Sequence, residues 1–102
     1  MKEIQILSGV LHDIAEAAEW YDEERYAGLG ERLIATFYAS LPKIQRDGEI
    51  YRTVYGEFRR IWISPFPYAV FFRLHQDVWI VSLVIHAARR PKLVRALLRE
   101  RK

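Results

Sequence analysis

The spacing of hydrophobic residues changes once along this chain, near residue 48, and that change limits the folds open to it. From residue 9 to residue 44 the apolar positions recur with the period of an α-helix that is buried on one face. Beyond residue 48 they alternate with polar positions, which is the period of a β-strand. A chain that is helical first and extended afterwards belongs to the α+β class, with helices packed on an antiparallel sheet.

The helical half is predicted to form two helices joined by a short loop. Ser8 is expected to cap the first helix, whose apolar stripe is Val10, Leu11, Ile14, Ala17, Ala18 and Tyr21. The residues Ala27-Gly28-Leu29-Gly30 break it, and a second stripe follows at Leu33, Ile34, Phe37, Leu41 and Ile44. Pro42 should kink this helix or start a new turn, and Asp47-Gly48 should end it. So short a connection makes an α-helical hairpin.

Four strands are predicted after the hairpin, near Ile50–Tyr55, Glu57–Ser64, Tyr68–Leu74 and Val78–His86. Because the turns between them are short, the strands should form a twisted antiparallel meander. Lys2 to Leu7 is expected to be an N-terminal edge strand, and residues 91–101, led by Pro91, a short C-terminal helix. Residues 1–102 are then expected to be a single domain.

Alternation assigns the strand residues to two faces of the sheet. The face predicted to lie under the hairpin collects Ile61, Ile63, Tyr68, Val70, Phe72, Leu74, Trp79, Val81, Leu83 and Ile85. The opposite face collects Arg60, Trp62, Phe71, Arg73, Ser82 and His86, which mix aromatic and cationic side chains. The second face is therefore the candidate working surface.

Composition argues against several classes of protein. The chain has no cysteine, which removes disulfides, thiolate metal sites and cysteine nucleophiles. No long uncharged apolar stretch is present and the acidic N-terminal third is unlike a signal peptide, so a soluble, cytoplasmic protein with no membrane partner is expected. His12, His75 and His86 fall in a helix, a turn and a strand end, so no metal site is predicted. Glycine-rich nucleotide motifs are absent, and no cofactor is expected.

Charge is distributed unevenly along the chain. Residues 1–31 carry eight acidic and two basic residues, a net −6, whereas residues 86–102 carry seven basic residues and one acidic residue, a net +6. A cationic end favours an anionic partner such as nucleic acid or an acidic protein segment. A solvated helix face explains the same residues equally well, and the pattern alone leaves both interpretations open.

Several short motifs follow one another along nearly the whole chain. They are Leu11-His12-Asp13-Ile14, Trp20-Tyr21-Asp22, Gly28-Leu29-Gly30-Glu31-Arg32-Leu33, Phe58-Arg59-Arg60-Ile61, Phe66-Pro67-Tyr68 with Val70, and His86 with Arg89-Arg90-Pro91. In this order they resemble the RelE/ParE toxin family, whose fold is a helical hairpin on a twisted antiparallel sheet.

The resemblance implies the toxin of a bacterial type II toxin–antitoxin system, of the kind associated with plasmid stabilisation and growth inhibition. A cognate antitoxin protein would neutralise it, and operator DNA would be reached only through that antitoxin. Fold leaves the activity open within the family, since some members cleave messenger RNA on the ribosome and others poison DNA gyrase.

The nucleases of this family resemble one another in an arginine directly after the strand tyrosine, and that position here is Ala69. If the chain is an mRNA endoribonuclease acting without metal, the catalytic residues are His86 as acid or base and Arg60 and Arg73 as electrostatic stabilisers. No second proton-transfer group is evident on that face, and the Gly-Leu-Gly junction resembles the ParE branch. A gyrase-poisoning toxin is therefore the favoured prediction, with the ribosome-dependent nuclease as the alternative.

A non-toxic, degenerate relative that acts only as a binding module in an autorepressor complex is the second alternative. For a target or an antitoxin, the predicted binding residues are Arg60, Trp62, Phe71, Arg73, His86, Arg89, Arg90, Leu93, Leu97 and Leu98. The leucines are expected to cover the open face, with Arg95, Arg99 and Arg101 exposed.

Several of these residues have a simpler structural explanation. His86 is expected to cap its strand through a backbone hydrogen bond, and Arg59 and Arg60 to pair with Glu49 or Glu57. Trp62 and Phe71 are expected to pack beneath the C-terminal helix.

Overall fold

Three helices and a five-stranded sheet make up the computed structural model, which describes residues 1–102. The helices are α1 (Ser8–Glu24), α2 (Leu29–Asp47) and α3 (Pro91–Glu100), and a 3₁₀ turn, η1 (Gly48–Ile50), follows α2. The strands are β1 (Glu3–Ile6), β2 (Thr53–Tyr55), β3 (Phe58–Trp62), β4 (Tyr68–His75) and β5 (Val78–His86). The predicted α+β fold, with its hairpin, meander and C-terminal helix, is confirmed.

The strands lie in the order β1-β5-β4-β3-β2. Strands β2 to β5 form the expected antiparallel meander, while β1 is an edge strand that runs parallel to β5. Pairing of β1 covers β5 only from Val78 to Val81, so residues 82–86 have no strand neighbour on that side. Strand β5, which lies next to the β1 edge strand, therefore keeps a short stretch without a strand partner.

The loop between α1 and α2 explains the Gly-Leu-Gly junction. Gly28 has φ +97°, which only glycine adopts without strain, and α2 begins directly after it at Leu29. A Cβ on Gly30 would lie 2.5 Å from the carbonyl oxygen of Ala18, so α1 and α2 meet too closely there for a side chain. The carboxylate of Asp22 accepts hydrogen bonds from the N–H groups of both glycines, which ties the two helices together.

Several predicted boundaries are wrong by a few residues. Ser8 is the first residue of α1 rather than its cap, because Leu7 precedes the helix and no side chain caps it. The second helix begins at Leu29, inside the predicted break, and runs without interruption through Pro42. Residues 48–50, predicted to end the helical region and begin the first strand, form η1 instead. The β5 bounds and the start of α3 at Pro91 are confirmed.

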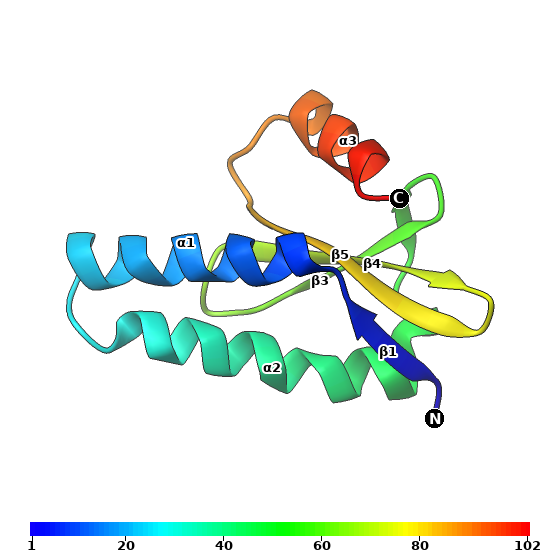
Figure 1. The fold of residues 1–102 in the computed structure, drawn as a ribbon, viewed down its shortest axis with the longest axis horizontal. Helices are drawn as coiled ribbons and strands as arrows, with labels where there is room; N and C mark the ends of the chain where they lie inside the picture. Colours follow the sequence, from blue (N-terminus) through cyan, green and yellow to red (C-terminus); the bar gives the residue numbers. More distant parts are fainter.

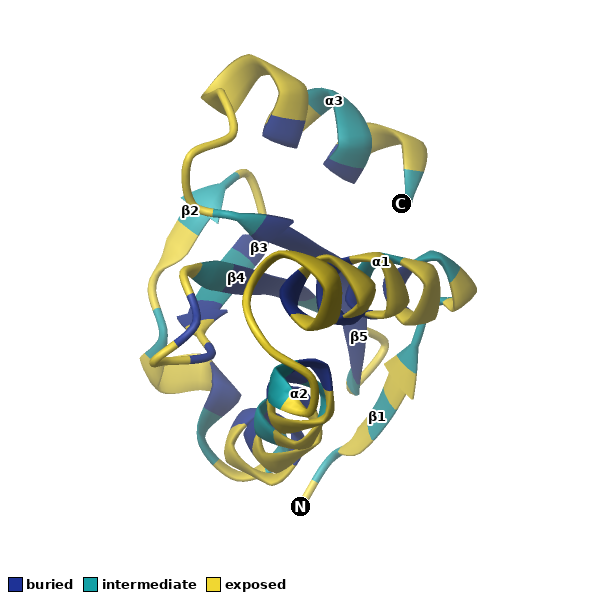
Figure 2. Ribbon diagram, turned by 90° about the vertical axis from the view of Figure 1, so that its left-hand side faces the viewer, coloured by how far each residue is buried: buried dark blue, intermediate teal, exposed yellow.

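Side chains on the two faces of the sheet form separate hydrophobic clusters. The larger one packs α1 and α2 on the sheet through residues that include Phe37, Phe72 and Trp79. The smaller one packs α3 on the opposite face through Phe58, Ala69, Phe71, Leu83, Ile85, Val94 and Leu98. Figures 1 and 2 show the hairpin on one side of the sheet and α3 on the other. The sheet is thus the middle layer, covered broadly on one face and by a single short helix on the other.

Alternation along β5 is interrupted at Ser82. Phe71 pairs with Leu83, but its neighbour Phe72 pairs with Val81, so Ser82 is an extra residue without a partner on β4. This β-bulge reverses which face each later residue occupies. Leu83 and Ile85 therefore pack against α3, and their predicted position under the hairpin is wrong.

Candidate functional site

The predicted working surface is the face of the sheet that α3 covers. Phe71 is 2% exposed and packs with Val94 and Leu98, and Ser82 is fully buried. Trp62 remains 44% exposed, and the guanidinium carbon of Arg60 lies 4.9 Å from its ring centroid. The expectation that α3 covers Phe71 is confirmed, whereas for Trp62 it is wrong. Arg60 and Trp62 are what remains accessible of the predicted face.

His86 lies on the hairpin side of the sheet. It pairs in register with Tyr68, which packs against the hairpin cluster, and the two ring centroids are 5.1 Å apart. Arg60 pairs with Phe71 on the α3 side, so the sheet stands between His86 and Arg60. The bulge at Ser82 is the physical reason, since it turns His86 to the opposite face. Its Nδ1 accepts a hydrogen bond from the N–H of Ala88 at 2.9 Å, which is the predicted capping role.

Arg73 is held in an ion pair on the α3 side. Its Nη1 donates to Oε1 of Glu57 at 2.8 Å. Burial acts to raise the pKa of Glu57, but the hydrogen bond from Arg73 and the nearby charge of Lys102 outweigh it, and the pKa lies below its ordinary value. Arg59 donates to the backbone carbonyls of Glu49 and Tyr51 rather than to a carboxylate, so its predicted pairing with an acidic side chain is wrong.

The leucines of α3 differ in their burial. Leu98 is 2% exposed and lies against the sheet, while Leu93 is 38% exposed and Val94 takes the buried position instead. Leu97 is half-buried at the edge of the smaller cluster. Arg89 and Arg90 are exposed in the turn before α3. The predicted cover over the sheet is thus made by Val94 and Leu98.

Arg101 is partly buried, so its predicted exposure is wrong. Its Nη2 donates to Oδ1 of Asp13 in α1 at 2.9 Å, and its Nη1 donates to Oδ2 of Asp13 and to the carbonyl oxygen of Ser82. Asp13 Oδ2 also accepts the N–H of Val84 at 3.0 Å. We call this pair the Asp13–Arg101 clamp. It joins α1 to the end of α3. It also binds the N–H of Val84 and the C=O of Ser82, two backbone groups of β5 that have no neighbouring strand on that side.

The clamp also shifts the pKa of Arg101. Its hydrogen bond to Asp13 raises the pKa of Arg101, and partial burial opposes that effect without cancelling it. Sequence reasoning did not identify the clamp, because 88 residues separate its members and no local pattern links Asp13 to Arg101.

A groove of about 560 Å³ runs beside the free edge of β5, between α1 and α3. We call it the α1–β5 groove, and its lining includes Trp20 and Glu16 of α1, residues 83–86 of β5, and Arg89, Leu97 and Arg101. It gathers His86, Arg89 and Leu97 from the predicted binding set. The clamp binds the backbone of Ser82 and Val84 on this edge, and the remaining backbone of residues 84–86 has no strand partner. A strand edge of this kind beside apolar side chains is suited to an added peptide segment, which gains backbone hydrogen bonds from it.

Tyr68 also lines this groove, beside His86. Burial raises its pKa above the ordinary value, Tyr21 acts in the same direction, and the charge of Arg89 opposes them. A phenol held in its protonated form is a weak proton acceptor near neutral pH. Tyr68 is therefore better suited to packing beside His86 than to acting as its base.

The structure has neither a cluster of candidate metal ligands nor a helix that could span a membrane. No three histidine, aspartate or glutamate residues come together in a group that could hold a metal ion. None of the helices combines the length and the apolar character needed to cross a membrane.

Comparison with known proteins shows what the fold is similar to. No family model and no curated protein matches the sequence. In three dimensions the chain is similar to a chain of a solved structure described as "Chromosomal ParDE TA system from P. aeruginosa". The TM-score is 0.74 over 84% of this chain and 96% of that chain, with 9% sequence identity. Because so few residues are identical, this likeness shows a shared fold, and that fold is the one expected from the family resemblance.

Proposed function

We propose that the chain is the toxin of a bacterial toxin–antitoxin pair, which inhibits growth by poisoning DNA gyrase and is held inactive by a cognate antitoxin. The observation that carries the proposal is the fold shared with a chain of the P. aeruginosa ParDE system over nearly the whole of that chain. The motif order that resembles the RelE/ParE family supports it independently of the coordinates.

The arrangement of the candidate catalytic residues favours gyrase over messenger RNA as the target. Cleavage of RNA needs an acid, a base and cations around one phosphate group. His86 lies on the hairpin side, Arg60 and Arg73 lie on the α3 side, and Arg73 is already paired with Glu57. Ala69 supplies no charge at the position where the family's nucleases carry arginine. The residues that the nuclease alternative requires are therefore not assembled around one point.

The α1–β5 groove is the surface we assign to the antitoxin. An extended antitoxin segment would lie along residues 84–86 of β5, beyond the backbone groups of Ser82 and Val84 that the clamp already binds, and place apolar side chains against Trp20 and Leu97. Operator DNA would then be contacted by the antitoxin and not by this chain. Nδ1 of His86 accepts the N–H of Ala88, and the rest of the imidazole ring lines this groove as a contact surface.

The proposal is tested by pulse labelling of new DNA and new protein in bacteria, minutes after the chain is induced without its partner. We expect DNA synthesis to stop first, and the purified chain to make gyrase accumulate cleaved DNA. The variant His86→Ala should keep this activity, because the side chain acts as a strand cap and contact. A nuclease that used His86 would lose about 10² to 10⁴ in rate on the same substitution.

Two other outcomes of the same experiment would support the alternative functions. If protein synthesis stops first and His86→Ala abolishes the effect, the chain is the ribosome-dependent nuclease and the gyrase proposal is wrong. If folded, soluble protein affects neither process, the chain is a binding module in an antitoxin complex.

A further inference from the structure

The side of α2 that faces away from the sheet has an unusual composition. A helix that packs by one side ordinarily carries charged and polar residues on the other. Helix α1 follows this rule, because its outward residues are His12, Glu16, Glu19 and Glu23. On α2 the four central outward residues carry no charge and are all exposed: Ala35, Tyr38, Ala39 and Pro42. The ring of Tyr38 keeps 47% of its surface open to solvent.

Charged residues lie only at the two ends of this outward side. Glu31 comes one turn before Ala35, and Arg46 comes one turn after Pro42. Glu31 belongs to none of the ion pairs in the structure, and Arg46 pairs only with its neighbour in sequence, Asp47. Helical spacing places six exposed residues on one side of α2, and we call them the α2 face: Glu31, Ala35, Tyr38, Ala39, Pro42 and Arg46. Figures 1 and 2 show that this side of the helix borders no other element.

The α2 face is complementary to itself when one copy is turned end for end. Its midpoint lies between Tyr38 and Ala39. Glu31 and Arg46 are equally far from that midpoint, about 11 Å along the helix axis in opposite directions. Two antiparallel copies of α2 would therefore set the large Tyr38 ring opposite the small Ala39 side chain. The same alignment sets each negative end opposite a positive end.

We propose that two copies of this chain associate through the α2 face, with their α2 helices antiparallel about a two-fold axis. Every contact in such an interface occurs twice, because both copies use the same surface. The Tyr38 ring of each copy packs in the space beside Ala39 of the other, and a Glu31–Arg46 ion pair closes each end. This inference is independent of the gyrase proposal.

The charges of the face select a second copy over other partners. A basic partner would match Glu31 and be repelled by Arg46, and an acidic partner would do the reverse. An uncharged apolar partner would use Tyr38 and leave both ends unpaired. Another α2 face supplies the opposite charge at both ends. Antiparallel helices also bring the negative carboxyl end of each helix beside the positive amino end of the other.

The contact is small, so the dimer should be weak. Residues 31–46 form a strip of about 23 Å by 10 Å on each copy, well below the area of a standard stable interface. We therefore expect a dissociation constant of about 10 to 100 μM.

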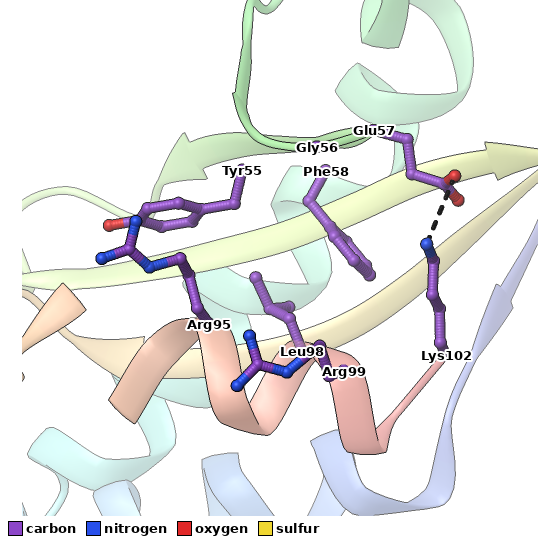
Figure 3. Close-up of a pocket in the computed structure, with 8 residues that line it drawn as sticks. All are labelled: Tyr55, Gly56, Glu57, Phe58, Arg95, Leu98, Arg99 and Lys102. Carbon is purple, nitrogen blue, oxygen red and sulfur yellow. Dashed lines mark ion pairs between the residues drawn. The ribbon is translucent and has the colours of Figure 1, made fainter. Parts of the chain in front are cut away.

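Pairing through α2 leaves the concave surfaces of the protein open. No residue of α2 lines the α1–β5 groove. A second pocket, of about 170 Å³, is formed where the turn between β2 and β3 meets the end of α3. Figure 3 shows Arg95 beside Tyr55 at one end of it, 5.4 Å from the ring centroid, and Lys102 beside Glu57 at the other. This pocket also contains no residue of α2, so a dimer could still bind an antitoxin.

The test is sedimentation equilibrium of the full chain between about 1 and 500 μM, which brackets the expected constant. Ala39→Glu should weaken association about 100-fold or more, because it places two unpaired carboxylates at the centre of the interface. The matched control is Ala15→Glu, the same change at an exposed position of α1. It should leave the dissociation constant within about twofold, since α1 lies outside the contact. Circular dichroism verifies that both variants are folded.

Charge reversal tests the pairing between copies directly. Glu31→Arg and Arg46→Glu each set like charges opposite one another at both ends, so each variant alone should associate about 4- to 30-fold more weakly. In an equimolar mixture of the two variants, one copy has two positive ends and the other has two negative ends. The mixed dimer should regain about the original affinity, as measured by energy transfer between differently labelled variants. Glu19→Arg on α1 is the control and should change neither measurement.

The outcomes decide the inference without touching the toxin proposal. Association that Ala39→Glu disrupts and the mixture of charge variants restores supports it. It is overturned if the chain stays monomeric throughout, if Ala39→Glu and Ala15→Glu act equally, or if the mixture associates no better than its components. If the chain stays monomeric and Ala39→Glu instead lowers affinity for the purified antitoxin, the α2 face belongs to the antitoxin and the inference is wrong. The gyrase proposal stands in each case, because it rests on the shared fold and not on α2.

Discussion

The two faces of the sheet differ in how they are covered. Sixteen buried residues join the sheet to the hairpin, whereas seven join it to α3. On the hairpin side, α1 and α2 each bury an apolar stripe along their length, so their charged side chains lie on the solvent side. On the α3 side one short helix covers Phe71 and Leu83 and leaves Trp62 and its arginine neighbours accessible. The hairpin side therefore supplies most of the folding energy, and the α3 side leaves aromatic and cationic side chains open to solvent.

The largest expected effect is on the hairpin side. Phe37 is fully buried between α2 and the sheet, so Phe37→Ala should lower the free energy of unfolding by about 3–5 kcal/mol through lost burial and a cavity. Urea denaturation measures it. A loss below about 1 kcal/mol would contradict the assignment of this face as the main core.

The matched substitution on the other face is Leu98→Ala. Leu98 is 2% exposed, but it anchors a helix of ten residues that can detach alone. We expect a global loss of about 2 kcal/mol, at the low end for a buried leucine, and faster hydrogen exchange confined to α3. Equal losses for Phe37→Ala and Leu98→Ala, with exchange raised throughout the sheet, would show that the two faces fold as one unit.

The Asp13–Arg101 clamp connects α1 to the end of α3, so its removal measures how strongly the hairpin and α3 are coupled. Asp13 and Arg101 side chains are 12% and 23% exposed, and Arg101→Gln leaves a partly buried carboxylate without its cation. We expect a loss of about 1–2 kcal/mol, less than for a fully buried pair. Asp13→Asn combined with Arg101→Gln should cost less than the sum of the single changes, as a double-mutant cycle measures. Additive losses would mean that the two side chains do not act together.

The smallest effect concerns pH on the α3 side. The pKa of Glu57 is below its ordinary value of 4.5, so its contribution to stability is complete above that pH and is lost as pH falls through the lowered pKa. Because the side chain is 45% exposed, the effect should be small. Thermal unfolding of the chain and of Glu57→Gln between neutral and acidic pH measures it. The variant should lose less stability on acidification, and identical profiles would contradict the ion-pair assignment.

Several side chains of the candidate site could be predicted from sequence, because alternation along a strand and the position of a strand end depend only on nearby residues. Arg60 and Trp62 were identified from alternation along β3, and the capping role of His86 follows from its place at a strand end. The pairing of Arg95 with Tyr55 was not identified, since it depends on where α3 docks. The predicted face of the sheet for His86 was wrong because of the bulge at Ser82, and no residue type in β5 indicates a bulge there.

Local sequence patterns account for the order of helices and strands, the hairpin junction at Gly28 and Gly30, and the separation of negative and positive charge along the chain. These follow from periodicity, from backbone freedom at glycine and from composition, which act over a few residues. Tertiary packing sets which face His86 and Leu83 occupy and brings Asp13 to Arg101. It also places the α1–β5 groove and a second pocket, lined by Arg95 and Arg99, on opposite sides of α3. Those features depend on strand register and helix docking, in which residues far apart in sequence compete for the same neighbours.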